Sequence, residues 1–273
     1  MHTGKMTRLA RLTHRRSGRS LIVPMDHGFT LGPIAGLADM RAAVMPLGGD
    51  SGLVQGVVLH RGVVAHLAET MPAHAVPPRL LHVSASTALR PDSSLKTLVA
   101  GIEEALMLGA DGVSVHVNLG DEAEPRMLRD FGTIAAECQR WGMPLLAMMY
   151  VRRQGRSSCE VADLKIAARA AAEMGADLVK VSYPGSVQAM REIVDGCFAP
   201  VLIAGGEKLG STREAVQLVR DALAGGAAGV CMGRNLFQSP DPAAVLQAVA
   251  EAIHGKAPEL PAVRRELPAL VAA

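Results

Sequence analysis

Aromatic residues, long apolar runs and an excess of either charge are scarce in this chain of 273 residues. Phenylalanine, tryptophan and tyrosine together make up 3% of the sequence, which argues against a protein that stacks single-stranded bases on aromatic rings. The formal net charge is +2, so there is no general attraction to nucleic acid or to anionic lipid. No apolar run reaches the roughly 18 to 20 residues that cross a bilayer, and no membrane partner is expected.

Cysteines are also few, and none of them forms a Cys-x-x-Cys pair. The four are scattered along the chain at Cys138, Cys159, Cys197 and Cys231. Such isolated cysteines are typical of buried side chains in a reducing compartment and indicate neither a disulfide framework nor a zinc site. The N-terminus is basic but lacks the apolar core of a signal peptide. These features indicate a soluble, cytoplasmic protein.

Apolar runs that resemble strands recur at regular intervals, and helical patterns lie between them. The runs are near Leu21–Met25, Leu53–Leu59, Arg79–Ser84, Val113–Leu119, Pro144–Tyr150, Leu178–Tyr183, Pro200–Ala204 and Gly229–Met232. The amphipathic stretches include Ser94–Leu108, Glu124–Trp141, Val161–Met174, Ser211–Ala224 and Pro242–His254. Eight strands alternating with eight helices are typical of an α/β fold, the (β/α)₈ TIM barrel. We expect a single domain over residues 1–273, with a basic N-terminal arm (about 1–19) and a C-terminal tail (about 256–273).

The N-terminal arm carries the one local cluster of basic residues. Its members are Lys5, Arg8, Arg11, Arg15, Arg16 and Arg19. A nucleic-acid role for this cluster is the less favoured alternative, and it predicts binding that weakens steeply with salt. An amphipathic segment that packs on the barrel or on a neighbouring subunit is favoured. We therefore expect no nucleic-acid partner.

Lys180 stands in the middle of a buried strand pattern, Leu178-Val-Lys-Val-Ser-Tyr183. The chain has only six lysines against 22 arginines, and a charged ammonium is unfavourable inside such a strand. Burial lowers the pKa of a lysine, and a neutral amine attacks carbonyl carbons to form a Schiff base. Lys180 is therefore the candidate nucleophile. The alternative is a lysine at the mouth of the strand whose charged end reaches solvent.

Polar residues follow the first and fifth strands, where the C-terminal ends of barrel strands carry catalytic groups. Asp26 could act as a general base or as the counter-ion of a protonated lysine, and its alternative role is to cap the next turn. The phenol of Tyr150 could pass a proton to a substrate, or the ring could simply pack at the rim. His27 is a weaker candidate for substrate binding, and Arg152 could hold a carboxylate or a phosphate.

Glycines follow the seventh and eighth strands and predict a phosphate site. Gly205, Gly206 and Gly233 would let backbone N–H groups approach an anion, with Arg234 supplying charge, as in the recurring phosphate site of this fold. Lys208 is the competing nucleophile, but its place in a loop beyond two glycines suits a hydrated phosphate contact better.

Three histidines, His60, His82 and His116, fall at or near strand ends. Their separations show no local metal-ligand spacing such as His-x-x-x-His. We therefore expect no metal and no other cofactor.

Six short motifs occur together in one order along the chain. They are Met25-Asp-His-Gly with Gly32-Pro-Ile-x-Gly36, Met148-Met-Tyr-x-Arg152, Leu178-Val-Lys-Val181, Ala204-Gly-Gly206 and Met232-Gly-Arg-Asn235. From about Arg8 to His254 the chain resembles the family that joins 2-amino-3,7-dideoxy-D-threo-hept-6-ulosonate synthase to the archaeal-type class I fructose-bisphosphate aldolases. The opening motif leans toward the heptulosonate synthase.

The resemblance implies a Schiff-base aldolase or transaldolase. Lys180 would form the Schiff base, Tyr150 would donate a proton and Asp26 would accept one. Gly205–Gly206 and Gly233–Arg234 would hold the phosphate of a ketose donor, whose enamine would join a small aldehyde, aspartate semialdehyde. No metal is needed because the iminium replaces the Lewis acid. The family also implies a homo-oligomer.

One departure and several alternatives concern the substrate. Members often carry Tyr-Pro-Arg after the fifth strand, and Val151 replaces the proline here, so the loop of Arg152 is less constrained. The alternatives are a fructose-bisphosphate aldolase, an aldolase joining dihydroxyacetone phosphate to aspartate semialdehyde, and a lysine-dependent thiolase on a phosphorylated signal molecule. A non-catalytic phosphosugar-binding barrel predicts ligand binding without a covalent adduct.

Overall fold

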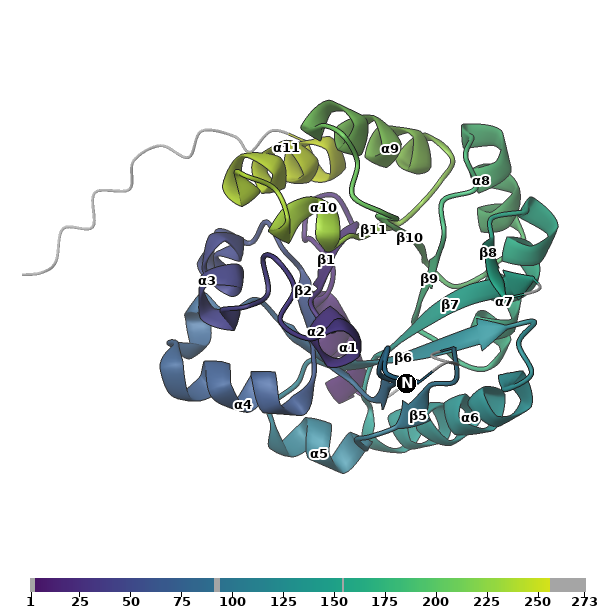
Figure 1. Ribbon diagram of the computed structural model, residues 1–273, viewed down its shortest axis with the longest axis horizontal. Helices are drawn as coiled ribbons and strands as arrows, with labels where there is room; N and C mark the ends of the chain where they lie inside the picture. The colour runs from purple at the N-terminus through teal and green to yellow at the C-terminus, as the bar shows by residue number, and fades with distance from the viewer. Residues whose placement is uncertain (1–2, 91–93, 154, 256–273) are drawn as a thin grey trace, which may run out of the picture.

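The computed structural model describes residues 3–90, 94–153 and 155–255, and the expected C-terminal tail lies outside these ranges. Eight parallel strands surround one axis, and pairing between β6 and β7 closes the ring (Figure 1). In chain order they are β1 (Ser20–Pro24), β2 (Gly56–Leu59), β3 (Arg79–His82), β6 (Gly112–Leu119), β7 (Leu145–Arg153), β9 (Leu178–Val181), β10 (Val201–Ala204) and β11 (Gly229–Cys231). The predicted (β/α)₈ barrel is confirmed.

Helices surround the ring of strands (Figure 1). The longer ones are α4 (Arg61–Thr70), α6 (Glu124–Trp141), α7 (Val161–Glu173), α8 (Val187–Asp195), α9 (Thr212–Ala224) and α11 (Pro242–His254). The shorter ones are α2 (His27–Leu31), α3 (Met40–Val44), α5 (Ile102–Met107) and α10 (Arg234–Phe237), with 3₁₀ turns η1 (Met45–Leu47), η2 (Gly49–Ser51) and η3 (Ala73–Ala75). In α6, Met127, Phe131, Ile134 and Cys138 are buried, and this helical spacing forms one apolar stripe against the sheet.

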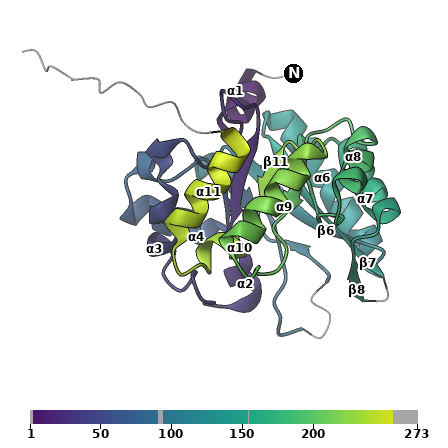
Figure 2. The ribbon, with the colours of Figure 1, turned by 90° about the horizontal axis from the view of Figure 1, so that it is seen from above.

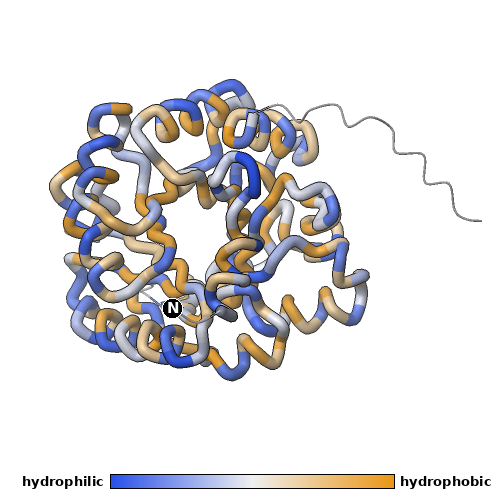
Figure 3. Tube along the Cα trace, turned by 180° about the vertical axis from the view of Figure 1, so that it is seen from behind, coloured by the Kyte–Doolittle hydropathy of each residue, from blue (hydrophilic) through white to orange (hydrophobic). Residues whose placement is uncertain are grey.

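Two layers of apolar side chains lie inside and outside the strands, because successive residues of a strand point to opposite faces. On β9, Val179 and Val181 belong to the outer layer beneath the helices. Leu178 belongs to the inner cluster, together with residues of the other strands such as Leu202. The hydropathy colouring of Figure 3 shows hydrophobic segments around the ring of strands. The same alternation places Lys180 on the inner face, within the barrel.

The N-terminal arm forms helix α1 (Thr3–Arg11), which covers one end of the barrel. Figure 2 shows α1 at the end opposite to α2 and the β7–β8 hairpin. Lys5 Nζ lies 2.9 Å from Asp177 Oδ2, and Leu12, just after the helix, is 0% exposed within the inner cluster. The arm therefore closes the N-terminal end of the barrel, and the catalytic groups of such a fold lie at the other end.

The largest difference from the expected elements lies between β3 and α5. Instead of a helix over Ser94–Leu108, the chain forms the antiparallel pair β4 (Ser84–Ala85) and β5 (Thr97–Leu98), and α5 begins only at Ile102. The apolar residues of this stretch recur at helical intervals, but backbone pairing with β4 overrides that pattern, since tertiary contacts outweigh local propensity. A second short strand, β8 (Arg156–Ser158), extends β7 as a hairpin.

Candidate active site

Lys180 lies on the inner face of β9 and is 5% exposed. Its backbone is flanked in register by Met148 of β7 and Leu202 of β10. Its Nζ lies 3.9 Å from Met148 Sδ and 5.7 Å from the centre of the Tyr150 ring. The alternative of a lysine that reaches solvent is excluded by this burial.

The groups around the Lys180 amine favour its charged form. Burial by itself lowers the pKa of this ammonium, but Cys231, Tyr150 and Asp26 together outweigh burial and raise it above the ordinary lysine value. The expectation of a neutral resting amine does not take these three groups into account. That expectation considered only desolvation of the strand, whereas the opposing groups come from other strands of the closed barrel. Lys180 must lose a proton before it can attack a carbonyl carbon.

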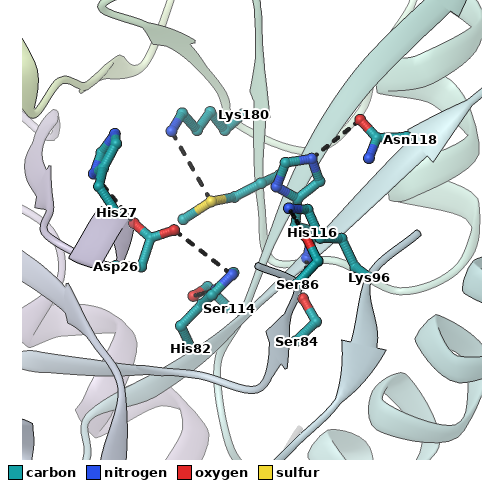
Figure 4. A network of polar contacts seen from close by, with 11 residues as sticks. Asp26, His27, His82, Ser84, Ser86, Lys96, Ser114, His116, Asn118 and Lys180 are labelled. Atoms are coloured by element: carbon teal, nitrogen blue, oxygen red, sulfur yellow. Dashed lines mark hydrogen bonds and ion pairs between the residues drawn. The ribbon is translucent and has the colours of Figure 1, made fainter. Parts of the chain in front are cut away.

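Asp26 follows β1 and faces the same cavity as Lys180 (Figure 4). Its Oδ2 lies 3.7 Å from His82 Nε2, and its Oδ1 is buried with no hydrogen-bond partner among the described residues. Burial raises the pKa of this carboxyl, but His82, His27 and Lys180 outweigh burial and lower it below its usual value. The side chain makes no capping hydrogen bond to α2, so the capping alternative is excluded.

His82 lies next to Asp26 but carries no positive charge that would neutralise the carboxylate. It is buried, its Nδ1 lies 2.8 Å from Ser114 Oγ, and burial lowers its pKa to about 4 although Asp26 opposes the shift. At neutral pH this imidazole is therefore uncharged, and the ammonium of Lys180 is the cation that balances the carboxylate. The counter-ion role foreseen for Asp26 fits this electrostatic arrangement.

Two cavities meet at the lysine, and three residues line both of them: His27, Tyr150 and Lys180. The larger cavity has a volume of about 420 Å³ and is bordered by the loops after β10 and β11. The smaller cavity has a volume of about 180 Å³ and is lined by polar side chains. These are Asp26, His60, His82, Ser84, Lys96 and His116. A substrate carbonyl on Lys180 would thus have room on two sides.

The glycines expected to bind phosphate line the larger cavity together with Arg234. Arg234 Nη2 donates a hydrogen bond to Gly206 O at 2.9 Å and so joins the two loops. A side chain at position 233 would place a Cβ 2.4 Å from Pro24 O, so the close approach of the backbone requires Gly233. These loops and the arginine border the cavity that Lys180 also lines.

Lys208 does not join this cluster. It is exposed and lines a separate cavity of about 160 Å³. Asn235 accounts for this position, because its Oδ1 accepts a hydrogen bond from Leu209 N at 2.7 Å and its Nδ2 donates to Glu207 O at 3.1 Å. The loop is thereby clamped so that the lysine lies outside both cavities of Lys180.

Arg152 lies near the smaller cavity but does not line it. Its Nε donates to Asn118 Oδ1 at 3.0 Å and its Nη1 donates to Ser157 Oγ at 2.5 Å. The same Asn118 oxygen lies 3.2 Å from His116 Nε2. The sequence had indicated neither Asn118 nor Lys96 as part of the site, because a buried asparagine within a strand carries no motif and Lys96 fell in an expected helix.

Neither a metal cluster nor a membrane helix is found in the described part of the chain. Within it, no group of three or more His, Cys, Asp or Glu side chains is arranged to hold a metal ion. Over the same residues, no helix combines the length and apolarity that a membrane crossing requires.

A buried lysine beside a phenol and a carboxylate, at the C-terminal end of a closed (β/α)₈ barrel, defines a Schiff-base carbon–carbon lyase or transferase. The model of the family described as DeoC/LacD family aldolase matches residues 20–239. The chain belongs to this aldolase family, and it is an enzyme of the class I aldolase type. The predicted resemblance and the predicted enzyme class are confirmed.

Relatives with assigned activities cover nearly the whole chain. One is the 2-amino-4,5-dihydroxy-6-oxo-7-(phosphonooxy)heptanoate synthase of Streptomyces griseus, 43% identical over 251 residues, or 90% of this chain and 89% of that protein. Another is the 2-amino-3,7-dideoxy-D-threo-hept-6-ulosonate synthase of Halobacterium salinarum, 38% identical, covering 93% of each chain.

A solved structure shows the covalent chemistry of a related barrel. It is an archaeal fructose-1,6-bisphosphate aldolase whose catalytic lysine is covalently bound to the carbinolamine intermediate of the substrate. The TM-score is 0.81 at 28% identity, over 92% of this chain and 100% of that one.

Proposed function

We propose that the protein joins the enamine of a ketose phosphate, held on Lys180, to aspartate semialdehyde. The observation that carries this proposal is the position of the Lys180 amine where two cavities meet. One cavity is bordered by glycines and Arg234, and the other has room for a second, smaller substrate. An aldol addition needs both substrates at one carbon atom, and this layout supplies one cavity for each.

The products named for the two relatives support the same acceptor. Both are seven-carbon chains with an amino group at C2, hydroxyls at C4 and C5 and a ketone at C6. Breaking the C4–C5 bond in either product gives a four-carbon amino aldehyde, aspartate semialdehyde, and a three-carbon hydroxyketone unit. The two products differ at C7, which carries phosphate in one and is deoxygenated in the other.

Dihydroxyacetone phosphate is the donor that we propose first, because the larger cavity has an arginine and close backbone approach at the rim. The second candidate is a transaldolase, favoured by the 7-deoxy product of the Halobacterium relative. In that reaction a longer ketose phosphate is first cleaved on the lysine, and its phosphorylated fragment leaves before the enamine meets the aldehyde.

The residue roles in the proposed reaction follow from their positions around Lys180. After losing its proton, the amine attacks the donor carbonyl to give a carbinolamine, and loss of water gives an iminium. A base removes a proton from the adjacent hydroxymethyl carbon, which forms the enamine. We assign proton donation to Tyr150 and proton acceptance to Asp26, whose Oδ1 has no partner among the described residues. His27 lines both cavities and would contact the bound donor.

Carbon–carbon bond formation then completes the cycle. The enamine carbon attacks the aldehyde carbon of the acceptor, and the aldehyde oxygen takes up a proton to become the C4 hydroxyl. Water hydrolyses the new iminium, which releases the C6 ketone and returns the amine of Lys180. The remote phosphate contact with Arg234 orients the reacting carbonyl during these steps.

Reductive trapping tests the proposal. Cyanoborohydride with dihydroxyacetone phosphate should add a three-carbon phosphorylated group to the Lys180 peptide, and Lys180→Met should abolish the adduct, whereas Lys208→Met should retain it. An adduct on Lys208 would overturn the assignment. With aspartate semialdehyde added, a product that retains phosphorus indicates the aldolase, and a phosphorus-free product from a longer ketose phosphate indicates the transaldolase.

A further inference from the structure

We propose that Lys96 binds the carboxylate of the amino-aldehyde acceptor in the smaller cavity. This rests on the function proposed above and names the contact that selects the second substrate. In Figure 4, Lys96 and His116 lie on one side of the group of side chains and His27 lies on the other, with Lys180 between them. Lys96 and Lys180 line the same cavity of about 180 Å³.

The hairpin between β3 and α5 fixes the position of Lys96. It directly precedes β5, whose Thr97 pairs with Ala85 of β4, and Val99 N donates to Val83 O at 2.9 Å. On the other side, Lys96 N donates to Met127 Sδ at 3.5 Å. Backbone contacts on both sides therefore fix the Cα of this lysine, and its amine contacts Ser86 in the cavity.

Among the described residues, the ammonium of Lys96 has no carboxylate within ion-pair distance. Over the described residues, no carboxylate oxygen lies within 4.0 Å of it, and its Nζ makes one hydrogen bond, to Ser86 Oγ at 2.6 Å. An ammonium has three donors, so two are available to a ligand. Burial lowers the pKa of Lys96. The positive charge of Arg152 lowers it further, whereas the carboxylate of Asp26 raises it. A partly buried cation without a partner is unfavourable until an anion binds.

The groups nearest to Lys96 favour an anion, and Asp26 is the carboxylate that opposes them. His116 has a pKa well below its ordinary value because it is buried, so it is neutral at physiological pH. Arg152 donates a hydrogen bond to the same Asn118 oxygen that His116 contacts. It also contributes a second positive charge near Lys96. Among the described residues, Asp26 is the carboxylate named as acting on Lys96. Its Oδ2 lies 3.7 Å from His82 Nε2, and we assign it to the donor chemistry.

Arg234 and Lys96 border different cavities of Lys180, and we assign one substrate to each of them. Arg234 borders the larger cavity on the side of the β10 and β11 loops, whereas Lys96 lines the smaller cavity on the side of β4 and β5. The donor phosphate suits the larger cavity, which leaves the smaller one for the acceptor. The acceptor must then place its aldehyde toward Lys180 and its charged end away from it, and Lys96 is the cation at that distal end.

A comparison of two aldehydes tests this assignment. Aspartate semialdehyde and 3-aminopropanal differ only by the carboxylate, and both are used with dihydroxyacetone phosphate as donor. Lys96→Met should raise the KM for aspartate semialdehyde roughly 10- to 100-fold, the value of a lost charged hydrogen bond. The same variant should leave the KM for 3-aminopropanal within about twofold, and Lys96→Arg should recover most of the loss. Lys165→Met, an exposed lysine of α7, is the matched control.

Trapping of the donor separates failure of this inference from failure of the proposed function. The adduct of dihydroxyacetone phosphate on Lys180 should form equally in the wild type and in Lys96→Met, because donor binding does not involve Lys96. An equal loss for both aldehydes, or no loss for either, would overturn the carboxylate contact while the adduct persists. A wild type that uses both aldehydes equally well would also overturn it, whether or not the variants fold. Absence of the adduct in the wild type would overturn the proposed function and this inference together.

Discussion

Lys180 Nζ lies 5.7 Å from the centre of the Tyr150 ring, and the two side chains come from adjacent strands. The register partner of Lys180 on β7 is Met148, and Tyr150 follows it by two residues on the same face of the strand. The phenol therefore lies one step nearer the C-terminal end of the barrel, from which a substrate enters. Both side chains line the two cavities.

The charge on Lys180 predicts a rate of Schiff-base formation that rises with pH. Because the pKa of this ammonium is raised, the protein at neutral pH lies below it, and the neutral fraction grows tenfold per pH unit. The initial rate of adduct formation with dihydroxyacetone phosphate and cyanoborohydride should therefore increase about tenfold per unit between about pH 6 and pH 8. A rate that is constant over this range would indicate a neutral resting amine.

Asp26→Asn should shift that pH dependence toward lower pH. Removal of the carboxylate takes away one of the groups that raise the pKa of Lys180, so more of the amine is neutral at a given pH and trapping at pH 6 should be faster than in the wild type. Turnover should nevertheless fall, because the proposed proton acceptor is lost. Trapping rates measured side by side at several pH values test this, and an unshifted profile would contradict the counter-ion role.

Tyr150→Phe should separate adduct formation from the proton transfers that follow. The ring contacts with Lys180 and His116 remain, but the phenolic proton is lost. We expect kcat to fall by roughly 10²- to 10⁴-fold, the usual contribution of a positioned acid or base, while an adduct on Lys180 still accumulates. If kcat falls by less than about tenfold, the phenol is a packing residue of the rim.

The fold could be predicted because its strands are short apolar runs with clear ends. The helix expected over Glu124–Trp141 has those limits in the structure, and the inward direction of Lys180 follows from alternation along β9. The β4–β5 hairpin could not be predicted, because its paired residues lie 12 and 14 positions apart and the apolar spacing of the stretch imitates a helix. Lys96 lies in this hairpin, directly before β5. Because a helix was expected there, Lys96 was not predicted to be part of the site.

The electrostatic state of the site depends on groups that the sequence does not bring together. The pKa of Lys180 reflects Tyr150 of β7, Cys231 of β11 and Asp26 just after β1, and their distances become defined only when the barrel closes. The position of Lys208 depends in the same way on Asn235, 27 positions later, which clamps the loop. The motifs identified the reacting groups. The charge of Lys180 and the position of the loop that carries Lys208 could be determined only from the folded structure.

Arg234→Met should weaken binding of a phosphorylated donor. We expect the KM for dihydroxyacetone phosphate to rise roughly 10- to 100-fold, as for the loss of a charge-assisted contact. The KM for unphosphorylated dihydroxyacetone should change much less. Arg213→Met, on the exposed surface of α9, provides the control. Lys208→Met should alter either KM by no more than about twofold. Equal losses for both donors would instead assign Arg234 to bracing the loop through Gly206 O.

Leu12→Ala should destabilise the barrel at the end opposite to the reacting groups. Leu12 is 0% exposed and packs with Ile22, Leu80 and Leu178 in the inner cluster, so truncation should cost about 2 to 5 kcal/mol of unfolding free energy. Leu89→Ala, at a position 94% exposed, should shift the denaturation midpoint very little. The adduct on Lys180 should still form in native Leu12→Ala protein, because the lysine contacts Met148 and Tyr150 and not the arm. A midpoint equal to that of the Leu89 variant would mean that the N-terminal arm is an appendage and not the floor of the barrel.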